Sequence, residues 1–175
     1  MRETVSILTS AKPPWLLRIA INLPDIEREL HRLRADFGFV TCMLDARKMN
    51  TVNGVFKEFA AALDFPDYFG CNGDAFRDCL TDLSWIDLEC AFPRGVCIVV
   101  VAAETLLVDE SSEIGWLLEL LEDACKDWSV AIEVGEWWDR AAVPFHVLFH
   151  TASASSENLP TELATLPLPK QSPPF

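Results

Sequence analysis

The sequence contains no long apolar run, so it offers no candidate for a membrane span. Its longest uninterrupted apolar stretch is residues 96–103, far shorter than the roughly 20 residues that a spanning helix needs. The first residues also lack a long apolar segment ending in a small-residue cleavage site, so we expect no signal peptide. We therefore expect a soluble, cytoplasmic protein with no membrane partner.

Histidine is scarce, and the cysteines lack diagnostic spacing. The chain has 3 histidines and 6 cysteines, and no two cysteines form the Cys-x-x-Cys pattern of zinc and redox sites. Four of the cysteines fall within apolar patterns, where a free thiol behaves as a small hydrophobic side chain. We therefore expect reduced thiols, no metal site, no cofactor and no thiol nucleophile. The four are Cys42, Cys79, Cys97 and Cys125.

Positive charge is scarce as well, and the negative excess is localised. The chain has 14 basic and 27 acidic residues, which gives a net charge of -13. Residues 72–139 alone hold 3 basic and 16 acidic residues, so this segment carries the entire excess. Such a field repels nucleic acid and attracts a basic partner, although the same charge also serves solubility.

What is present is the composition and pattern of one globular domain. The chain has 175 residues, of which 50% are hydrophobic and 23% charged, which suits a single domain with additions. Hydrophobic periodicity and the capping residues Asn22, Thr51 and Ser111 or Ser112 predict alternating strands and helices. This order favours an α/β fold with a small parallel sheet. The expected strands are residues 15–20, 38–44, 96–102 and 144–150, and the expected helices are residues 24–37, 51–63, 73–83 and 112–128.

From residue 151 the composition changes. Residues 151–175 hold five of the 11 prolines together with many serines and threonines, and they lack usable periodicity. We expect a flexible tail. The alternative is that Leu163, Leu166 and Leu168 pack against the body.

The helix predicted at residues 73–83 has two distinct faces. Four apolar residues stand at positions i, i+3, i+4 and i+7, and three aspartates stand at i, i+4 and i+8. Asp78 lies about 160° around the helix axis from Phe76, so the aspartates line the face opposite the core. Only Asp74 lies in the first turn, where the helix dipole stabilises a negative charge. Repulsion within the row of aspartates therefore slightly destabilises the helix, and a basic partner would offset this cost. A merely solvated face is the alternative. The apolar residues are Phe76, Cys79, Leu80 and Leu83, and the aspartates are Asp74, Asp78 and Asp82.

Residues 65–83 resemble the barstar family of intracellular ribonuclease inhibitors. The family pattern reads roughly Pro-x-Tyr-Tyr/Phe-Gly-x-Asn-x-Asp-Ala-x-x-Asp-Cys-Leu. The resemblance implies a barstar-like domain at residues 38–150 with a three-stranded parallel sheet packed with helices. It leaves residues 1–37 as an N-terminal strand and helix that pack on this core, and residues 151–175 as a tail. The matching residues are Pro66, Tyr68, Phe69, Gly70, Asn72, Asp74, Ala75, Asp78, Cys79 and Leu80.

The resemblance also implies a function that is not enzymatic. In barstar the corresponding helix plugs the active site of a ribonuclease by mimicking its substrate. By that match Asp78 would occupy the pocket for an RNA phosphate, and Asp74 would bind beside it. Tyr68 would pack near the catalytic histidine, and Trp85 falls near a flanking aromatic position. The implied partner is a basic ribonuclease or ribonuclease-type toxin, and the free inhibitor is expected to be a monomer.

Three positions depart from the family pattern or are not fixed by it. Gly73 stands where many members have tryptophan, and Arg77 stands where barstar has an aromatic residue. A basic residue at position 77 would oppose a basic cleft, so the partner need not be barnase. The acid that barstar supplies from a later helix falls at Glu122 or Asp123.

Two other functions remain open from the sequence. One is a regulatory module that binds a basic partner other than a nuclease. The other is a hydrolase that uses Asp74 and Asp78 as paired carboxylates, with or without a metal ion. Hard-cation sites usually take further oxygen ligands from loops, and none is evident in the pattern.

Overall fold

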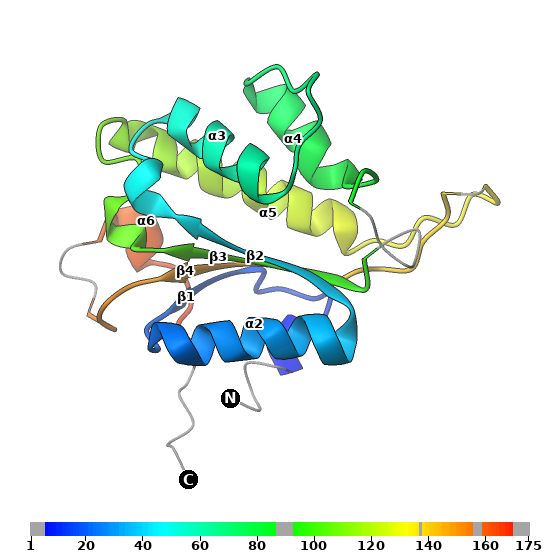
Figure 1. The fold of residues 1–175 in the computed structure, drawn as a ribbon, viewed down its shortest axis with the longest axis horizontal. Coiled ribbons are helices and arrows are strands. Elements are labelled where there is room, and N and C mark those ends of the chain that lie inside the picture. The colour runs from blue at the N-terminus through cyan, green and yellow to red at the C-terminus, as the bar shows by residue number, and fades with distance from the viewer. Residues whose placement is uncertain (1–5, 87–92, 137, 156–158, 170–175) are drawn as a thin grey trace, which may run out of the picture.

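A computed structural model describes residues 6–86, 93–136, 138–155 and 159–169. Its centre is a four-stranded parallel sheet in the order β1-β4-β3-β2 (Figure 1). The strands are β1 (Leu16–Ile19), β2 (Phe39–Asp45), β3 (Gly95–Val101) and β4 (Phe145–His150). Residues 96–100 of β3 are buried, as expected for a central strand covered on both faces.

Helices cover both faces of this sheet. Figure 1 shows α2 (Leu23–Phe37) on one face, and α3 (Val52–Ala62), α4 (Gly73–Asp82) and α5 (Ile114–Trp128) on the other. Each face has its own hydrophobic cluster, a smaller one under α2 and a larger one under the other three helices. The remaining elements are short: η1 (Ala46–Lys48), η2 (Ala103–Thr105), η3 (Ser111–Glu113) and α6 (Thr161–Ala164).

Most of the predicted helix ends are confirmed. The Asn22 side chain accepts a hydrogen bond from the Asp25 amide at 3.0 Å, and the Thr51 hydroxyl accepts one from Gly54 at 3.2 Å. The prediction that a serine caps the next long helix is wrong. Ser111 and Ser112 lie in η3, and α5 begins after Glu113 without a side-chain cap.

The expectation of three strands is corrected to four. The N-terminal strand β1 joins this sheet, because it pairs in parallel with β4 from Leu16 opposite Val147 to Ile19 opposite His150. It therefore forms one edge of the sheet, while β2 forms the other edge. Local patterning cannot show this, since the pairing joins residues more than 120 positions apart.

The expectation of a flexible tail is wrong for residues 159–169. Leu163 of α6 is fully buried in the larger cluster, and Leu166 packs against that cluster. The Arg18 amide of β1 donates to the Pro167 carbonyl at 2.9 Å. The segment adds two apolar anchors to the sheet edge, and two leucines are too few to produce a periodic signal.

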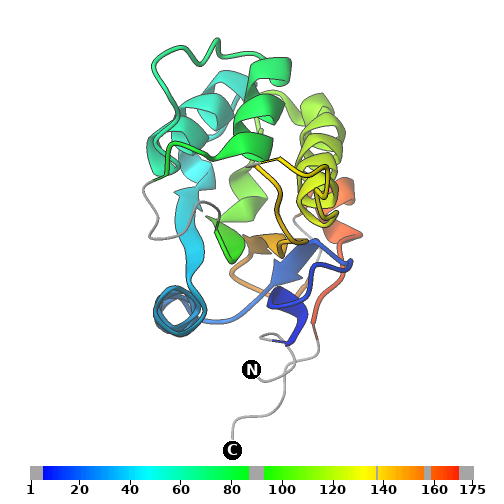
Figure 2. The same ribbon diagram turned by 90° about the vertical axis from the view of Figure 1, so that its right-hand side faces the viewer.

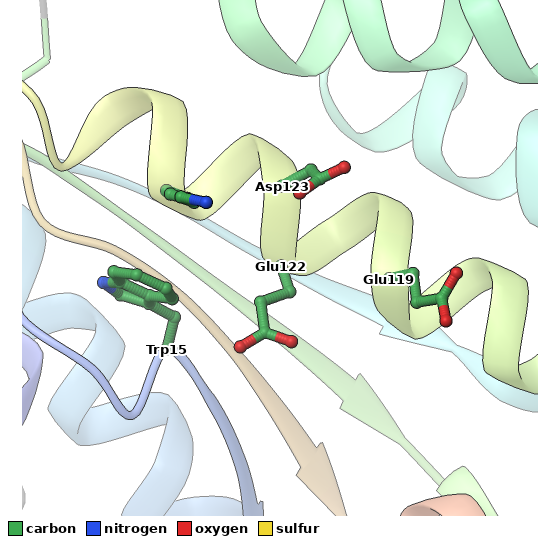
Figure 3. A pocket seen from close by; sticks show the side chains of 5 residues that line it. Trp15, Glu119, Glu122 and Asp123 are labelled. Carbon is green, nitrogen blue, oxygen red and sulfur yellow. The ribbon is translucent and has the colours of Figure 1, made fainter.

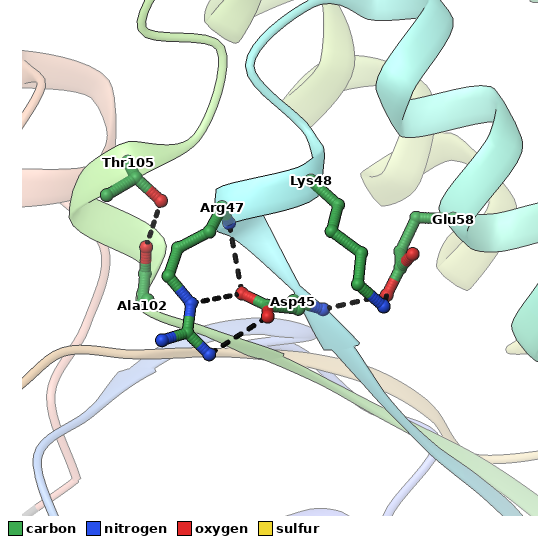
Figure 4. Close-up of polar contacts among 6 residues, drawn as sticks. All are labelled: Asp45, Arg47, Lys48, Glu58, Ala102 and Thr105. Carbon is green, nitrogen blue, oxygen red and sulfur yellow. Dashed lines mark hydrogen bonds and ion pairs between the residues drawn. The ribbon is translucent and has the colours of Figure 1, made fainter.

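Charged and polar groups pair with one another where β2 and β3 end (Figure 4). Arg47 Nε lies 2.8 Å from Asp45 Oδ1, and this contact holds the pKa of the Asp45 carboxyl below its usual value. Glu58 accepts a hydrogen bond from the Asp45 amide at 3.1 Å and lies 3.4 Å from the Lys48 ammonium. The polar side chains drawn at this edge thus fix the turns that follow the strands.

Candidate protein-binding surface

Helix α4 presents its aspartates to solvent, as the sequence predicts. Phe76, Leu80 and Leu83 are buried, whereas Asp74, Asp78 and Asp82 are exposed. The Phe76 ring lies 5.0 Å from Phe59 and 5.3 Å from Phe56, measured between ring centroids. Aromatic contacts of this kind fix the rotation of α4 about its axis. The buried face therefore orients the acidic face.

The loop before α4 is ordered and presents Tyr68. The Asn72 side chain caps the helix by accepting from the Ala75 amide at 2.9 Å, and the Phe69 amide donates to the Pro66 carbonyl at 2.9 Å. Tyr68 is 77% exposed although it is a large aromatic residue. The loop that leads into α4 therefore presents an exposed aromatic ring.

Arg77 does not stand free on this surface. Its guanidinium lies 2.7 Å from the carboxylate of Asp127 on α5, and both side chains are about half exposed. The expectation that Arg77 opposes a basic cleft is therefore weakened, because its charge is paired within the chain. No pattern in the sequence predicts Asp127 as the partner of Arg77, because the two residues lie 50 positions apart.

Gly73, the first residue of α4, lies against the Trp116 side chain of α5. A Cβ atom built at position 73 would lie 2.9 Å from Trp116 Cζ2, closer than real Cβ contacts. The Trp116 ring also packs edge-on against Phe56 at 6.3 Å. An aromatic ring thus covers the start of α4, but it comes from α5 and not from position 73. No pattern in the sequence links these two positions.

The Trp85 side chain is held against the core and is only partly exposed. Its indole Nε1 donates to the Leu63 carbonyl at 3.0 Å, and its ring lies 5.8 Å from that of Phe65. The side chain is half-buried and packs against the core. It fastens the turn after α4 to the end of α3, so only part of it is available to a partner.

The two candidate acids of α5 point in different directions (Figure 3). Both are exposed and line a shallow groove. Figure 3 shows Glu122 pointing toward Trp15 and Asp123 pointing the other way. Of Glu122 and Asp123, the two acids that the sequence leaves open, Asp123 is therefore the one that points away from Trp15 and β1. The groove is lined by Trp15, Glu119, Glu122, Asp123 and Lys126.

Several observations bear on the chemistry that this surface supports. Among the described residues no three of His, Cys, Asp and Glu gather as a metal site. Within the same residues no helix is long and apolar enough to cross a membrane. The five described cysteines are free, and burial raises the pKa of the Cys79 thiol, with a smaller contribution from Asp78. Cys90 lies outside the described residues.

Comparison with known proteins agrees with the resemblance seen in the sequence. A family model described as Barstar (barnase inhibitor) matches residues 39–150. A Bacillus subtilis (strain 168) protein named "Putative ribonuclease inhibitor YrdF" is 41% identical over 46 residues, which are 26% of this chain and 48% of that protein. The chain thus spans about half the length of the curated relative that it matches.

A solved structure described as "Structure of Drosophila ORC bound to DNA" contains a chain with a related fold. It is 16% identical, with a TM-score of 0.58 over 95% of this chain and 28% of that one. At this identity the likeness concerns the fold alone. The family model covers well over half of the chain, and on that ground the chain belongs to the barstar family of ribonuclease inhibitors.

Proposed function

We propose that this chain is a non-enzymatic inhibitor that inserts α4 into the active-site cleft of a basic ribonuclease. The observation that carries the proposal is the exposed row of Asp74, Asp78 and Asp82 on a helix whose opposite face is buried, in a chain of the barstar family. The relative's name supports a ribonuclease as the partner.

A carboxylate suits this task because it resembles an RNA phosphate to the enzyme. Arginine side chains bind carboxylate and phosphate oxygens with the same pair of parallel hydrogen bonds. Asp78 stands in the middle of the row, where it can reach furthest into a cleft, and Asp74 and Asp82 flank it by one turn each. Asp123 of α5 is proposed to add a fourth carboxylate from the side.

The rest of the site supports the same mode of binding. The Arg77–Asp127 pair balances the positive charge of Arg77 with a negative charge of the same chain. Tyr68, Asn72 and Gly73 are proposed to form the leading end of the inserted element, where Tyr68 offers an aromatic face and Asn72 caps the helix. Trp85 is proposed to border the contact with the exposed part of its ring.

The experiment measures RNA hydrolysis by purified barnase and by a set of other basic bacterial ribonucleases, each with the chain added in equal amount. We expect stoichiometric inhibition of at least one. Asp78→Ala should weaken that inhibition by at least about a hundredfold, since arginines of the enzyme lose a buried partner worth about 2–5 kcal/mol. That scale is drawn partly from the complex of barstar with barnase, and so from this family.

The matched control is Asp36→Ala, which removes an exposed aspartate from α2 on the other face of the sheet. It should leave inhibition unchanged, and Asp78→Ala should change the free energy of unfolding by no more than about 0.5 kcal/mol. Absence of inhibition across the set would overturn the proposal and favour a basic partner that is not a nuclease. If the chain itself hydrolysed RNA and Asp78→Ala abolished this activity, the chain would instead be a hydrolase.

A further inference from the structure

Between α5 and β4 the chain forms a projecting arm, residues 129–136 and 138–140, which Figure 1 shows extending away from the body. The sequence predicts neither a helix nor a strand for these residues. In the structure Ile132 and Arg140 exchange two backbone hydrogen bonds, of 2.8 and 3.0 Å, and form an antiparallel bridge. The arm is therefore a short hairpin-like element with its own pairing.

The far end of the arm is held by Asp139. Its carboxylate accepts hydrogen bonds from the amides of Val134 at 3.0 Å and Gly135 at 2.8 Å, and these bonds hold the pKa of Asp139 below its usual value. Gly135 has φ +86°, a left-handed conformation that glycine adopts without strain. Asp139 and Gly135 together specify this turn.

The base of the arm is held by Arg140. Its guanidinium donates to the carbonyls of Asp127 at 3.0 Å and of Trp128 and Val130 at 3.1 Å each. It also stacks over the Trp128 ring, 4.3 Å from the centroid. The one basic group of the arm is thus engaged by backbone carbonyls, while Glu133 and Glu136 are exposed. The arm presents negative charge.

The arm also presents apolar side chains that serve no core of this chain. Val130 is 60% exposed and Val134 is 66% exposed. Neither belongs to the buried set of either hydrophobic cluster. These two side chains are therefore available for contact with another protein.

The arm lies beside the end of α4. A groove between them is lined by Thr81 of α4, Asp127 of α5, and Val130, Ile132 and Arg140 of the arm. Figure 2 shows α4 and the arm on the same side of the molecule, facing the viewer. Thr81 directly precedes Asp82, so the groove adjoins the C-terminal end of α4, where the row of aspartates ends.

We propose that the arm is a second binding element for the same basic ribonuclease that α4 engages, an inference that rests on the proposed function. An enzyme seated on Asp78 and Asp82 extends over the groove, because the groove adjoins α4. Val130 and Val134 then cover an apolar patch beside the cleft of the enzyme, and the glutamates face its basic rim. Because the arm is already ordered, little conformational entropy is lost when it binds.

The test compares Val130→Ser and Val134→Ser with the matched control Val108→Ser. Val108 is also 60% exposed, but it lies in the loop before α5, where the neighbouring Leu107 amide bonds to the Met49 carbonyl. The probe is the ribonuclease that the wild-type chain inhibits in the set above, and the readout is its dissociation rate. We expect the two arm substitutions, combined in one chain, to accelerate dissociation about tenfold, which is the usual effect of removing an apolar interface contact. Val108→Ser should leave the dissociation rate unchanged.

A second readout is amide hydrogen exchange across the arm with and without the ribonuclease. We expect slower exchange in the complex at residues 130–136. If the wild-type chain inhibits a ribonuclease but the arm variants dissociate like wild type and exchange is unchanged, the arm is not part of the interface and the function of α4 stands. If the wild-type chain inhibits none of the ribonucleases, both proposals fail.

Discussion

The Arg77 guanidinium on α4 lies 2.7 Å from the Asp127 carboxylate on α5 and ties the two helices together at the candidate surface. Because both side chains are about half exposed, we expect the pair to contribute less than about 1 kcal/mol to the free energy of unfolding. Its larger effect is on charge. It directs the one cation of α4 away from the row of aspartates.

Replacing Arg77 tests this arrangement. Arg77→Gln adds one net negative charge, so association with an inhibited basic ribonuclease should become faster at low salt, and the gain should disappear at high salt. Stopped-flow measurement at two salt concentrations checks this. The control is Arg28→Gln, which removes the cation of a comparable ion pair on α2. Slower association of Arg77→Gln would mean that Arg77 itself contacts the partner.

The contact between Gly73 and Trp116 predicts an overpacking effect. Gly73→Ala places a Cβ 2.9 Å from the Trp116 ring, and we expect it to lower the free energy of unfolding by about 1 kcal/mol. Urea unfolding measures the change, and the loss should shrink in a Trp116→Leu background. Gly115→Ala is the control, because nothing lies within 4 Å of its Cβ and alanine favours a helix. If Gly73→Ala and Gly115→Ala raised the free energy of unfolding equally, the close contact between position 73 and Trp116 would be contradicted.

The packed tail predicts that Leu163 contributes to stability. Leu163→Ala removes a fully buried side chain, and we expect a loss of about 2–4 kcal/mol in the free energy of unfolding. Leu168→Ala is the control, since that leucine is 37% exposed and should cost little. Thermal or urea unfolding checks both. Similar small losses for the two variants would show that α6 is not packed on the sheet in solution.

Buried His146 predicts a dependence of stability on pH. Its Nε2 lies 2.9 Å from the Ser10 carbonyl and donates to it, and its Nδ1 has no hydrogen-bond partner in the described part of the chain. Burial lowers the pKa of His146 below 6.5, and the nearby carbonyls offset only part of that shift. At a pH between these two pKa values, His146 is therefore protonated in the unfolded chain and neutral in the folded chain.

The stability contributed by neutral His146 is complete above about pH 6.5 and falls as the pH drops through that value toward the lower pKa of the folded state, by at most about 1.4 kcal/mol per pH unit. Urea unfolding at pH 7.5 and 5.5 measures this loss. His146→Gln keeps a hydrogen-bond donor but does not titrate, and its stability should change less over the same interval. An equal change in the two proteins would exclude His146 as its source.

Local chemistry was sufficient to predict most of the helices and strands and the exposed acidic face of α4. Asn22 and Thr51 begin helices because their side chains bind nearby amides, and the apolar stripe of α4 places its aspartates outward. These features depend on residues within two turns of each other, so a sequence contains them. The pattern at residues 65–83 also identified the family that the comparisons show.

Contacts between distant residues were decided only by the tertiary structure. The pairing of β1 with β4, the burial of Leu163, and the partners Asp127 and Trp116 of α4 join positions far apart in the chain. The arm likewise gained its order from the closure of Ile132 on Arg140 and from carbonyls at the end of α5. Such contacts form only after the sheet and helices have packed, because each depends on where non-neighbouring backbones come together. A pattern of side chains along one chain does not record that.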